Sequence, residues 1–143
     1  MKILVFGHSG QVATELRALD GNGVEIIALD RAAADAVINA AAYTAVDKAE
    51  SDEATVNVIN AQAPVAMARV CADRDIPFVS ISTDYVFSGE GTALWHPGDP
   101  TDPQGVYGRT KRDGEKLIEE IGGPYAILRT SWVVSAHGSN FIK

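Results

Sequence analysis

Continuous apolar runs alternate along the chain with stretches in which apolar residues recur every three or four positions. Runs of the first kind lie at residues 3–6, 24–29, 36–39, 77–82 and 125–129, and they predict strands buried on both faces. The helical spacing predicts helices after residue 12, over 54–72 with a kink or a new first turn at Pro64, and from Tyr107 to a stop at 122–124. Residues 46–53 are polar and are expected to form a solvated loop or helix face, and the predicted core includes Met67, Cys71, Leu117, Ile118 and Ile121. Strands that alternate with helices are typical of an α/β fold with a parallel sheet.

A glycine-containing turn follows the first strand and precedes the first helix. It reads Gly7-His8-Ser9-Gly10-Gln11-Val12-Ala13, which is a variant of the dinucleotide fingerprint with Ala13 in the helix-packing position. Such a turn directs backbone N–H groups and a helix N-terminus toward a phosphate. We therefore predict a Rossmann-like, doubly wound parallel sheet with helices on both faces, and a bound nicotinamide dinucleotide.

The end of the second strand carries Asp30 and Arg31, about twenty residues beyond the glycine turn. A carboxylate at this place accepts hydrogen bonds from the adenosine ribose, and an adjacent arginine accommodates a 2′-phosphate. Both NADH and NADPH therefore remain candidate cofactors. The candidate cofactor-binding residues at this stage are Gly7, Gly10, Gln11, Val12, Asp30 and Arg31.

The connection between the second and third strands is too short for this fold. Only residues 31–35 lie between the strand that ends at Asp30 and the next run at 36–39, whereas a parallel crossover needs a dozen or more residues. We infer that the sequence omits a segment near residues 31–35. Beyond the third strand, Ala40-Ala41-Ala42-Tyr43-Thr44 is a turn of small residues, which suits either a ligand against the backbone or close packing of a helix on a strand.

A tyrosine and a lysine stand four residues apart, at Tyr107 and Lys111, where a helical pattern begins. One helical turn places the two side chains on the same face. An ammonium beside a phenol is expected to lower the tyrosine pKa from about 10 and make it a general acid near neutral pH. The same spacing also arises by chance, so the pair needs support from the rest of the chain.

Composition excludes several other classes of function. The chain has 143 residues, 46% hydrophobic and 22% charged, with a formal net charge of −7 and no basic run, which argues against nucleic acid or anionic membranes as partners. The single cysteine, Cys71, lies in a helical segment and is expected to be a buried, inert thiol. The apolar run at residues 1–6 is too short for a signal peptide or a membrane span, and we expect a cytoplasmic location by default. Zinc signatures and a nucleophile elbow are absent from the sequence.

Hydroxyl groups and a carboxylate follow the fourth strand, in Ser82-Thr83-Asp84-Tyr85-Val86-Phe87. The carboxyl ends of parallel strands are where open α/β sheets bind ligands. Residues 88–105 then form a long Gly- and Pro-containing loop of the kind that is usually functional or mobile. A hydride donor, the Tyr107 acid and the Thr83 hydroxyl together make a ketone reductase.

Several long motifs, in order, resemble the dTDP-4-dehydrorhamnose reductase family, an extended branch of the short-chain dehydrogenase/reductases. The motifs are Gly7-x-x-Gly10-Gln11, the block from Val37 to Glu50, Ser82 to Phe87, Val106-Tyr107-Gly108-Arg109-Thr110-Lys111, and Arg129-Thr130-Ser131-Trp132-Val133. The interval from Thr83 to Tyr107, 107 − 83 = 24 residues, also resembles that of the superfamily. The resemblance spans essentially the whole chain.

The resemblance implies a role for each matching residue. Thr83, Tyr107 and Lys111 would be catalytic, with Tyr107 protonating the C4 oxygen of the sugar, Thr83 bonding the same oxygen, and Lys111 tuning the tyrosine and holding the nicotinamide ribose. Ala42, Tyr43 and Thr44 would contact the middle of the cofactor, and Val46, Asp84, Tyr85 and Trp132 the sugar. The implied product is dTDP-L-rhamnose, made with NADPH or NADH. Some family members use magnesium at a dimer interface, where Glu15 would match, although a solvated surface glutamate is the simpler interpretation.

Two departures from the family pattern limit the inference. The family continues for about as many residues again, so we expect residues 1–143 to be the cofactor-binding domain of a longer enzyme that lacks most of its C-terminal substrate part. Val134 stands where the family commonly has tyrosine. Two alternatives stay open: a non-catalytic regulatory subunit of the methionine adenosyltransferase type, and another extended reductase or epimerase acting on a nucleotide sugar.

Overall fold

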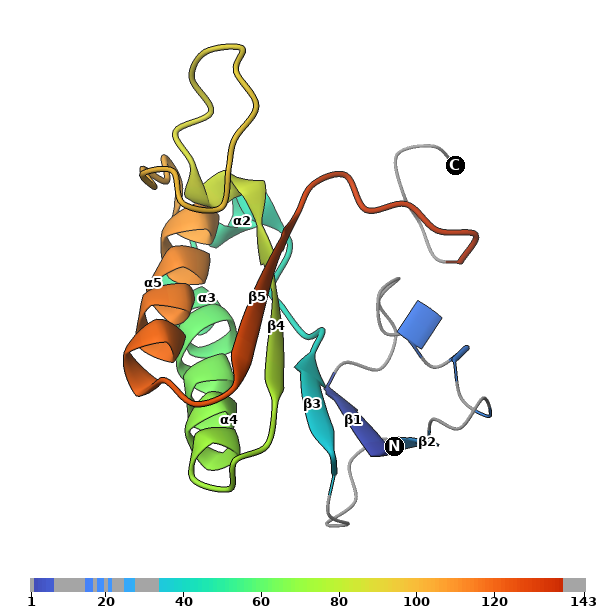
Figure 1. Ribbon diagram of the computed structural model, residues 1–143. Helices are drawn as coiled ribbons and strands as arrows, with labels where there is room; N and C mark the ends of the chain where they lie inside the picture. The colour runs from blue at the N-terminus through green and yellow to red at the C-terminus, as the bar shows by residue number, and fades with distance from the viewer. Residues whose placement is uncertain are drawn as a thin grey trace.

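The sheet confirms the predicted parallel α/β architecture. The computed structural model describes residues 2–6, 15–16, 18–19, 21, 25–27 and 34–137. Within them, five parallel strands form one sheet in the order β2-β1-β3-β4-β5 (Figure 1). The strands are β1 (Lys2–Phe6), β2 (Glu25–Ile27), β3 (Ala36–Asn39), β4 (Phe78–Thr83) and β5 (Tyr125–Thr130). Each matches one predicted apolar run, and β1 occupies the interior position expected for it, between β2 and β3.

Helices α3, α4 and α5 cover one face of this sheet (Figure 1). The helical elements are α2 (Val46–Ala49), α3 (Glu53–Asn57), the π-helical η1 (Val58–Gln62), α4 (Ala63–Ala72), the 3₁₀ turn η2 (Asp84–Val86) and α5 (Val106–Ile121). The helix predicted after the glycine turn falls on residues that are described only in part, of which Glu15 and Leu16 are helical. Its packing on the second face of the sheet lies outside the described residues.

The predicted helix over 54–72 changes geometry in its middle. Pro64 stands in the first turn of α4, directly after the π-helical turn η1. Proline has no N–H to donate to the carbonyl four residues earlier, here that of Asn60, and its ring crowds that carbonyl. A wider π turn is one way for a helix to accommodate such an interruption. The sequence predicted a kink or a new first turn at Pro64, and the structure confirms it.

The principal core lies between the sheet and helices α4 and α5. It contains Val37, Ala68, Cys71, Phe78 and Ile118, each less than 7% exposed, and partly buried Met67 and Ile121 pack against it. The predicted core positions of Met67 and Cys71 are confirmed. Leu117 was expected in the core but is 41% exposed, because it lies about 100° around α5 from Ile118.

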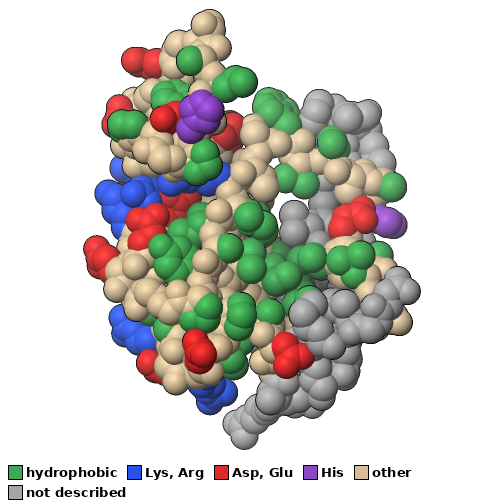
Figure 2. Space-filling model, viewed as in Figure 1, with side chains coloured by type: hydrophobic (Ala, Val, Ile, Leu, Met, Phe, Trp, Pro, Cys, Tyr) green, Lys and Arg blue, Asp and Glu red, His purple; other side chains and the backbone are tan. Residues whose placement is uncertain are grey.

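The outer strand β5 leaves apolar side chains accessible. Tyr125 is 41% and Leu128 49% exposed, and β5 pairs with β4 alone among the described strands. Apolar side chains gather over the middle of the view in Figure 2, whereas charged side chains cluster on its helical side.

None of the helices in the described part of the chain has the length and apolar character needed to span a membrane.

The short connection between β2 and β3 has to pass β1. Strand β1 pairs with β2 on one side and with β3 on the other, and both pairings are parallel. Residues 28–35 make this connection, and residues 28–33 lie outside the described part of the chain. The inferred omission near residues 31–35 therefore stays a prediction.

Helix α5 is capped by a residue distant in the sequence. The N-cap residue, Gly105, has no side chain, and the Oε1 atom of Glu50 accepts a 2.7 Å hydrogen bond from the N–H of Val106. The carboxylate thus meets the positive end of the helix dipole and satisfies one of its free N–H groups. Residues 46–53 were expected to form a solvated loop or helix face. They contain helix α2, whose Ala49 is fully buried.

We predict that Glu50→Ala lowers the free energy of unfolding by about 1–2 kcal/mol, the usual cost of losing a charge-assisted cap. Urea denaturation followed by circular dichroism measures the change. Glu120→Ala is the matched control, because it removes an exposed carboxylate near the other end of α5 and should leave stability within about 0.5 kcal/mol. Equal stability of the Glu50→Ala variant and the wild type would show that the cap is not energetically important.

Candidate active site

Thr83 ends strand β4 and is 5% exposed. Its Oγ1 atom accepts a 3.2 Å hydrogen bond from the N–H of Tyr85 and donates a 3.1 Å bond to Oδ1 of Asp84. The first bond caps the 3₁₀ turn η2, so the extended strand ends at Thr83 and the turn begins at the next residue. The hydroxyl is therefore fixed at the carboxyl edge of the parallel sheet, where such folds bind ligands.

Tyr107 lies in the first turn of α5, and its phenol meets this strand end. The Thr83 side chain is close enough to the phenol to lower its pKa. The Tyr85 ring packs edge-on against the Tyr107 ring, with centroids 5.6 Å apart. The structure thus brings together the hydroxyl and the phenol that the sequence selected 24 residues apart.

Two glycines of α5 allow this approach. A Cβ atom at Gly108 would collide with the carbonyl oxygen of Tyr85. A Cβ at Gly114 would lie 2.6 Å from the carbonyl oxygen of Asn60 in η1. The helix can pack this closely against both backbones only because neither position carries a side chain.

Lys111 lies one turn beyond Tyr107 and is 4% exposed. Its Nζ atom donates a 2.6 Å hydrogen bond to the carbonyl oxygen of Ile81 in β4. Burial of the ammonium lowers the pKa of Lys111 to about 8, and the nearby negative charge of Glu115 partly opposes this effect. The two residues therefore share a helix face, as predicted, but the ammonium bonds to the strand backbone.

The predicted direction of the Tyr107 pKa is wrong. Burial raises the pKa of Tyr107 above 10, the Thr83 hydrogen bond lowers it in part, and Asp84 and Tyr85 raise it further. A lowered pKa would require the Lys111 charge to act on the phenol, and Lys111 is not among the groups that shift it. The phenol is instead partly desolvated beside an acidic residue, and both effects favour its neutral form.

The small-residue turn after β3 is held by a side chain from η1. Asn60 Oδ1 accepts a 2.9 Å bond from the N–H of Tyr43, and its Nδ2 donates to the Tyr43 carbonyl at 3.1 Å and to Thr110 Oγ1 at 3.4 Å. Asn60 is 2% exposed, so both bonds to the turn are largely shielded from water. The turn containing Ala42, Tyr43 and Thr44 is therefore locked to α5, the helix of Tyr107.

Three buried polar atoms without partners among the described residues lie at or just beyond the carboxyl ends of β3 and β4. Asn39 Nδ2, Tyr43 Oη and Ser82 Oγ have no hydrogen-bond partner within the described part of the chain. Asn39 ends β3, and Ser82 is the next-to-last residue of β4. Buried polar groups normally have partners, so such atoms can accommodate a polar ligand or ordered water. With the small residues after β3, this arrangement fits a dinucleotide laid across the strand ends.

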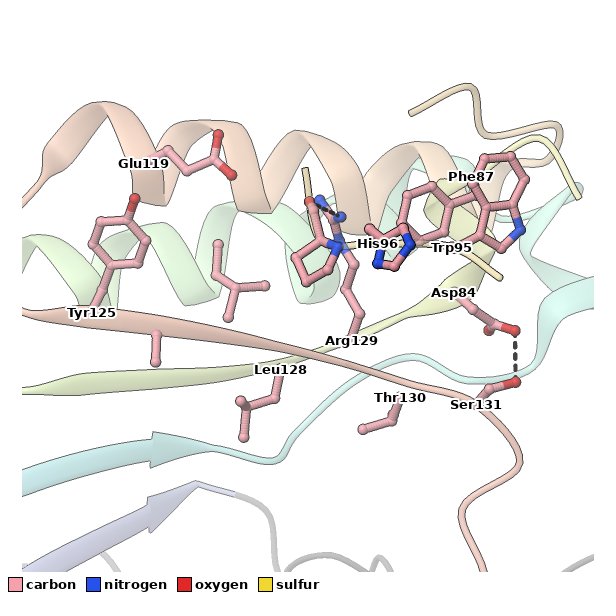
Figure 3. A pocket seen from close by; sticks show the side chains of 13 residues that line it. Asp84, Phe87, Trp95, His96, Glu119, Tyr125, Leu128, Arg129, Thr130 and Ser131 are labelled. Carbon is pink, nitrogen blue, oxygen red and sulfur yellow. Dashed lines mark hydrogen bonds between the residues drawn. The ribbon is translucent and has the colours of Figure 1, made fainter. Parts of the chain in front are cut away.

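The predicted sugar-binding residues surround the same edge. Tyr85 is 53% exposed, Val46 begins α2, and Trp132 is 73% exposed with a left-handed backbone, φ +50°. Asp84 Oδ2 accepts a 2.6 Å bond from the Ser131 hydroxyl, which joins η2 to the end of β5 next to Trp132 (Figure 3). Asp84 and Ser131 also line a groove of about 770 Å³ that runs along β5 past Phe87, Trp95 and His96 to Glu119 and Tyr125 (Figure 3).

The remaining predicted cofactor residues lie outside the described residues. These are Gly7, Gly10, Gln11, Val12, Asp30 and Arg31. Glu15, the magnesium candidate, has its Oε1 atom 3.0 Å from Nδ1 of His137, and this contact lowers the pKa of the Glu15 carboxyl. No group of three potential metal ligands occurs among the residues that the structure describes.

Sequence reasoning missed Asn60, Glu50 and Ser131. Asn60 interrupts the apolar stripe of a helix, and this polar break was the one local signal available. Glu50 and Ser131 act through contacts with residues 56 and 47 positions away, which no local pattern encodes.

Comparison with known proteins gives the family. The family described as RmlD substrate binding domain matches residues 1–143, the whole chain. The chain belongs to this family. The dTDP-4-dehydrorhamnose reductase of Sinorhizobium fredii is 38% identical over 160 residues, which cover 100% of this chain and 54% of that protein.

Solved structures of the RmlD family share the fold. The dTDP-4-dehydrorhamnose reductase of Clostridium acetobutylicum superposes with a TM-score of 0.92 at 36% identity, over 99% of this chain and 57% of that one. The Bacillus anthracis enzyme, solved in complex with NADP, has a TM-score of 0.91 at 29% identity, again over 99% and 57% of the two chains. The chain thus spans about half the length of the relatives it matches.

We predict that the difference in unfolding free energy between the wild type and Lys111→Met changes with pH. Below pH 8, Lys111 is charged in both the folded and the unfolded protein; between about 8 and 10.5 the unfolded chain holds a proton that the folded protein has lost. The unfolding free energy of the wild type should therefore rise by about 3 kcal/mol relative to Lys111→Met over this interval and become constant above it. Urea denaturation of both proteins between pH 7 and 11 measures the difference. A difference that does not change with pH would contradict the lowered pKa.

Proposed function

We propose that this chain carries the cofactor-binding and catalytic residues of an NAD(P)H-dependent reductase that converts the C4 ketone of dTDP-4-dehydro-L-rhamnose to the alcohol of dTDP-L-rhamnose. The observation that carries the proposal is the convergence of Thr83, Tyr107 and Lys111 near the carboxyl end of β4, where Tyr85 bonds to Thr83 and packs against Tyr107. Membership of the RmlD family and the names of its curated relatives support the substrate. A nucleotide-sugar ligand, a homodimer and a cytoplasmic location belong to the same proposal.

In the proposed reaction the nicotinamide cofactor, when bound, supplies the hydride to C4. Tyr107 then donates its phenolic proton to the C4 oxygen, so that hydride and proton together complete the alcohol. Thr83 donates a hydrogen bond to the same oxygen as negative charge develops there, its hydroxyl hydrogen turning from Asp84 Oδ1 to the substrate. A raised Tyr107 pKa keeps the phenol protonated throughout the neutral range, which is the state that a proton donor requires.

The cofactor is proposed to lie across the strand ends. The turn of Ala42, Tyr43 and Thr44 would contact its middle, since Asn60 fixes that backbone. Gly7, Gly10, Gln11 and Val12 would bind the pyrophosphate, and Asp30 and Arg31 the adenosine ribose and its substituents. Lys111 would hold the nicotinamide ribose. The Bacillus anthracis relative was solved with NADP, so NADPH is the first cofactor to assay.

Asp84, Tyr85, Val46 and Trp132 are proposed to bind the sugar. Asp84, Tyr85 and Trp132 follow directly on β4 and β5, and the bond between Asp84 and Ser131 holds the ends of these strands together. The carboxylate and the two aromatic rings supply a hydrogen-bond acceptor and apolar faces, which suits the mixed surface of a deoxy sugar.

We further propose that a crossover between β2 and β3 is missing from residues 1–143, which form the cofactor-binding domain. The alignment with the Sinorhizobium fredii enzyme spans 160 positions against 143 residues here, so at least 160 − 143 = 17 positions of that enzyme have no counterpart. The short link past β1 is where such a segment fits.

Peptide mapping tests the missing crossover. We predict that trypsin releases from the natural protein no peptide that spans residues 18–48 and has the mass calculated from residues 18–48 of the sequence. Such a peptide, arising from a missed cleavage at Arg31, would contradict the proposal, and the peptide covering residues 117–129 serves as the control for recovery.

We predict that Tyr107→Phe lowers kcat/KM by roughly 10²- to 10⁴-fold, the usual contribution of a positioned general acid. Oxidation of NADPH by the full-length protein with dTDP-4-dehydrorhamnose measures the rate. Tyr125→Phe is the matched control, because this tyrosine lies at the far end of β5 and should keep the rate within about twofold. Undiminished turnover by Tyr107→Phe, or no turnover by the wild type, would defeat the assignment.

A further inference from the structure

The carboxylate of Glu115 is buried where α5 faces β5. Glu115 is 3% exposed and lies one turn beyond Lys111. Its Oε1 accepts a 3.1 Å bond from Nε of Arg129, and its Oε2 accepts bonds of 2.8 Å from Nη2 of Arg129 and 3.2 Å from Nη1 of Arg112. The bond to Arg129 is thus bidentate, which is the strongest geometry for this pair.

Both arginines continue to the loop at residues 88–105. Arg129 Nη1 donates a 3.0 Å bond to the carbonyl oxygen of Pro97, and Arg112 Nε donates a 2.9 Å bond to Thr101 Oγ1. The Arg129 guanidinium also lies 5.0 Å from the centroid of the Phe87 ring. That ring stacks on Trp95 of the loop, with centroids 4.7 Å apart. One buried carboxylate therefore orients two cations that hold the loop directly at Pro97 and Thr101 and, through the Phe87 ring, at Trp95.

This loop joins the two halves of the candidate active site. It leaves η2, which carries Asp84 and Tyr85, and it ends at Gly105, the N-cap of the helix that carries Tyr107. The N–H of Asp102 donates a 3.0 Å bond to the carbonyl of Val86, so the far part of the loop also returns to η2. A displacement of the loop would move the proposed sugar-binding residues relative to the phenol.

The neighbouring glutamate provides a contrast. Glu119 accepts a 3.3 Å bond from Arg112 but is 42% exposed, and it has no bond to Arg129. A solvent-exposed pair of this kind contributes little, whereas removing one partner of a buried pair leaves the other charge without compensation.

We propose that Glu115 is a positioning residue that fixes the 88–105 loop, and through it the sugar-binding turn η2, against helix α5. The effect on turnover rests on the reductase function proposed above, whereas the effect on the loop does not. In this role Glu115 acts through Arg112 and Arg129 and does not touch the reacting atoms; separately, its charge helps Lys111 to stay protonated.

Hydrogen exchange measures the loop directly. In Glu115→Gln, which keeps the size of the side chain and removes its charge, peptides from residues 88–105 should exchange roughly 10- to 100-fold faster than in the wild type. Peptides from α4 should be unchanged, and Glu119→Gln should leave the loop at the wild-type rate. Equal loop exchange in Glu115→Gln and the wild type would overturn the proposal.

Steady-state kinetics of the full-length protein supply the second measurement. Glu115→Gln should raise the KM for dTDP-4-dehydrorhamnose roughly tenfold, with the KM for NADPH within about twofold, because the loop adjoins the sugar residues and not the 42–44 turn. A fall in kcat with both KM values unchanged would overturn positioning of the sugar site. If the wild type does not reduce this sugar, the reductase proposal fails while the exchange experiment still decides the role of Glu115.

Arg129→Lys keeps the test decisive if Glu115→Gln does not fold. Lysine preserves the positive charge but loses the two-pronged contact with Glu115 and the bond to Pro97. Faster loop exchange in this variant supports the proposal, and wild-type exchange contradicts it.

Discussion

Helix α5 comes so close to two backbone carbonyl oxygens that a methyl group at either contact would not fit. Gly108 lies against the carbonyl of Tyr85, and Gly114 against that of Asn60. The first contact brings the Tyr107 phenol within reach of Thr83, and the second seats the helix on η1, whose Asn60 side chain holds the 42–44 turn. The proposed proton donor, the strand-end hydroxyl and the proposed cofactor turn thus all depend on how closely this one helix packs against η1 and η2.

The same closeness forces charged groups into the interior. Lys111 and Glu115 lie one turn apart, each less than 5% exposed, on a helix face where an ordinary amphipathic pattern would place apolar residues. The Ile81 carbonyl accepts a hydrogen bond from the Lys111 ammonium, and two arginines balance the charge of Glu115. Buried charges of this kind reduce stability unless every partner is in place, so both residues depend on the partners that the fold supplies.

Sequence patterns predicted the elements of this fold but few of the contacts between them. The strands, the break at Pro64 and the stop at Gly122 depend on local chemistry, so β-branched runs and backbone restrictions were sufficient. Leu117 was misplaced because adjacent residues on a helix point about 100° apart, so an apolar residue beside a core position can face the solvent. The cap from Glu50, the clamp from Asn60 and the pairing of Glu115 with Arg129 join residues 56, 17 and 14 positions apart. Only the tertiary arrangement specifies such partners.

The Tyr107 pKa shows why the direction of a side chain matters as much as its spacing. Four residues of separation placed Lys111 on the correct face, yet its ammonium extends to the β4 backbone, and burial then dominates the environment of the phenol. A lowered pKa would suit a base that removes a proton from an alcohol. In the direction of reduction the tyrosine must begin protonated, and a partly desolvated phenol beside Asp84 retains its proton across the neutral range. The geometry therefore supports the proposed direction of the reaction through a different cause from the one that the spacing suggested.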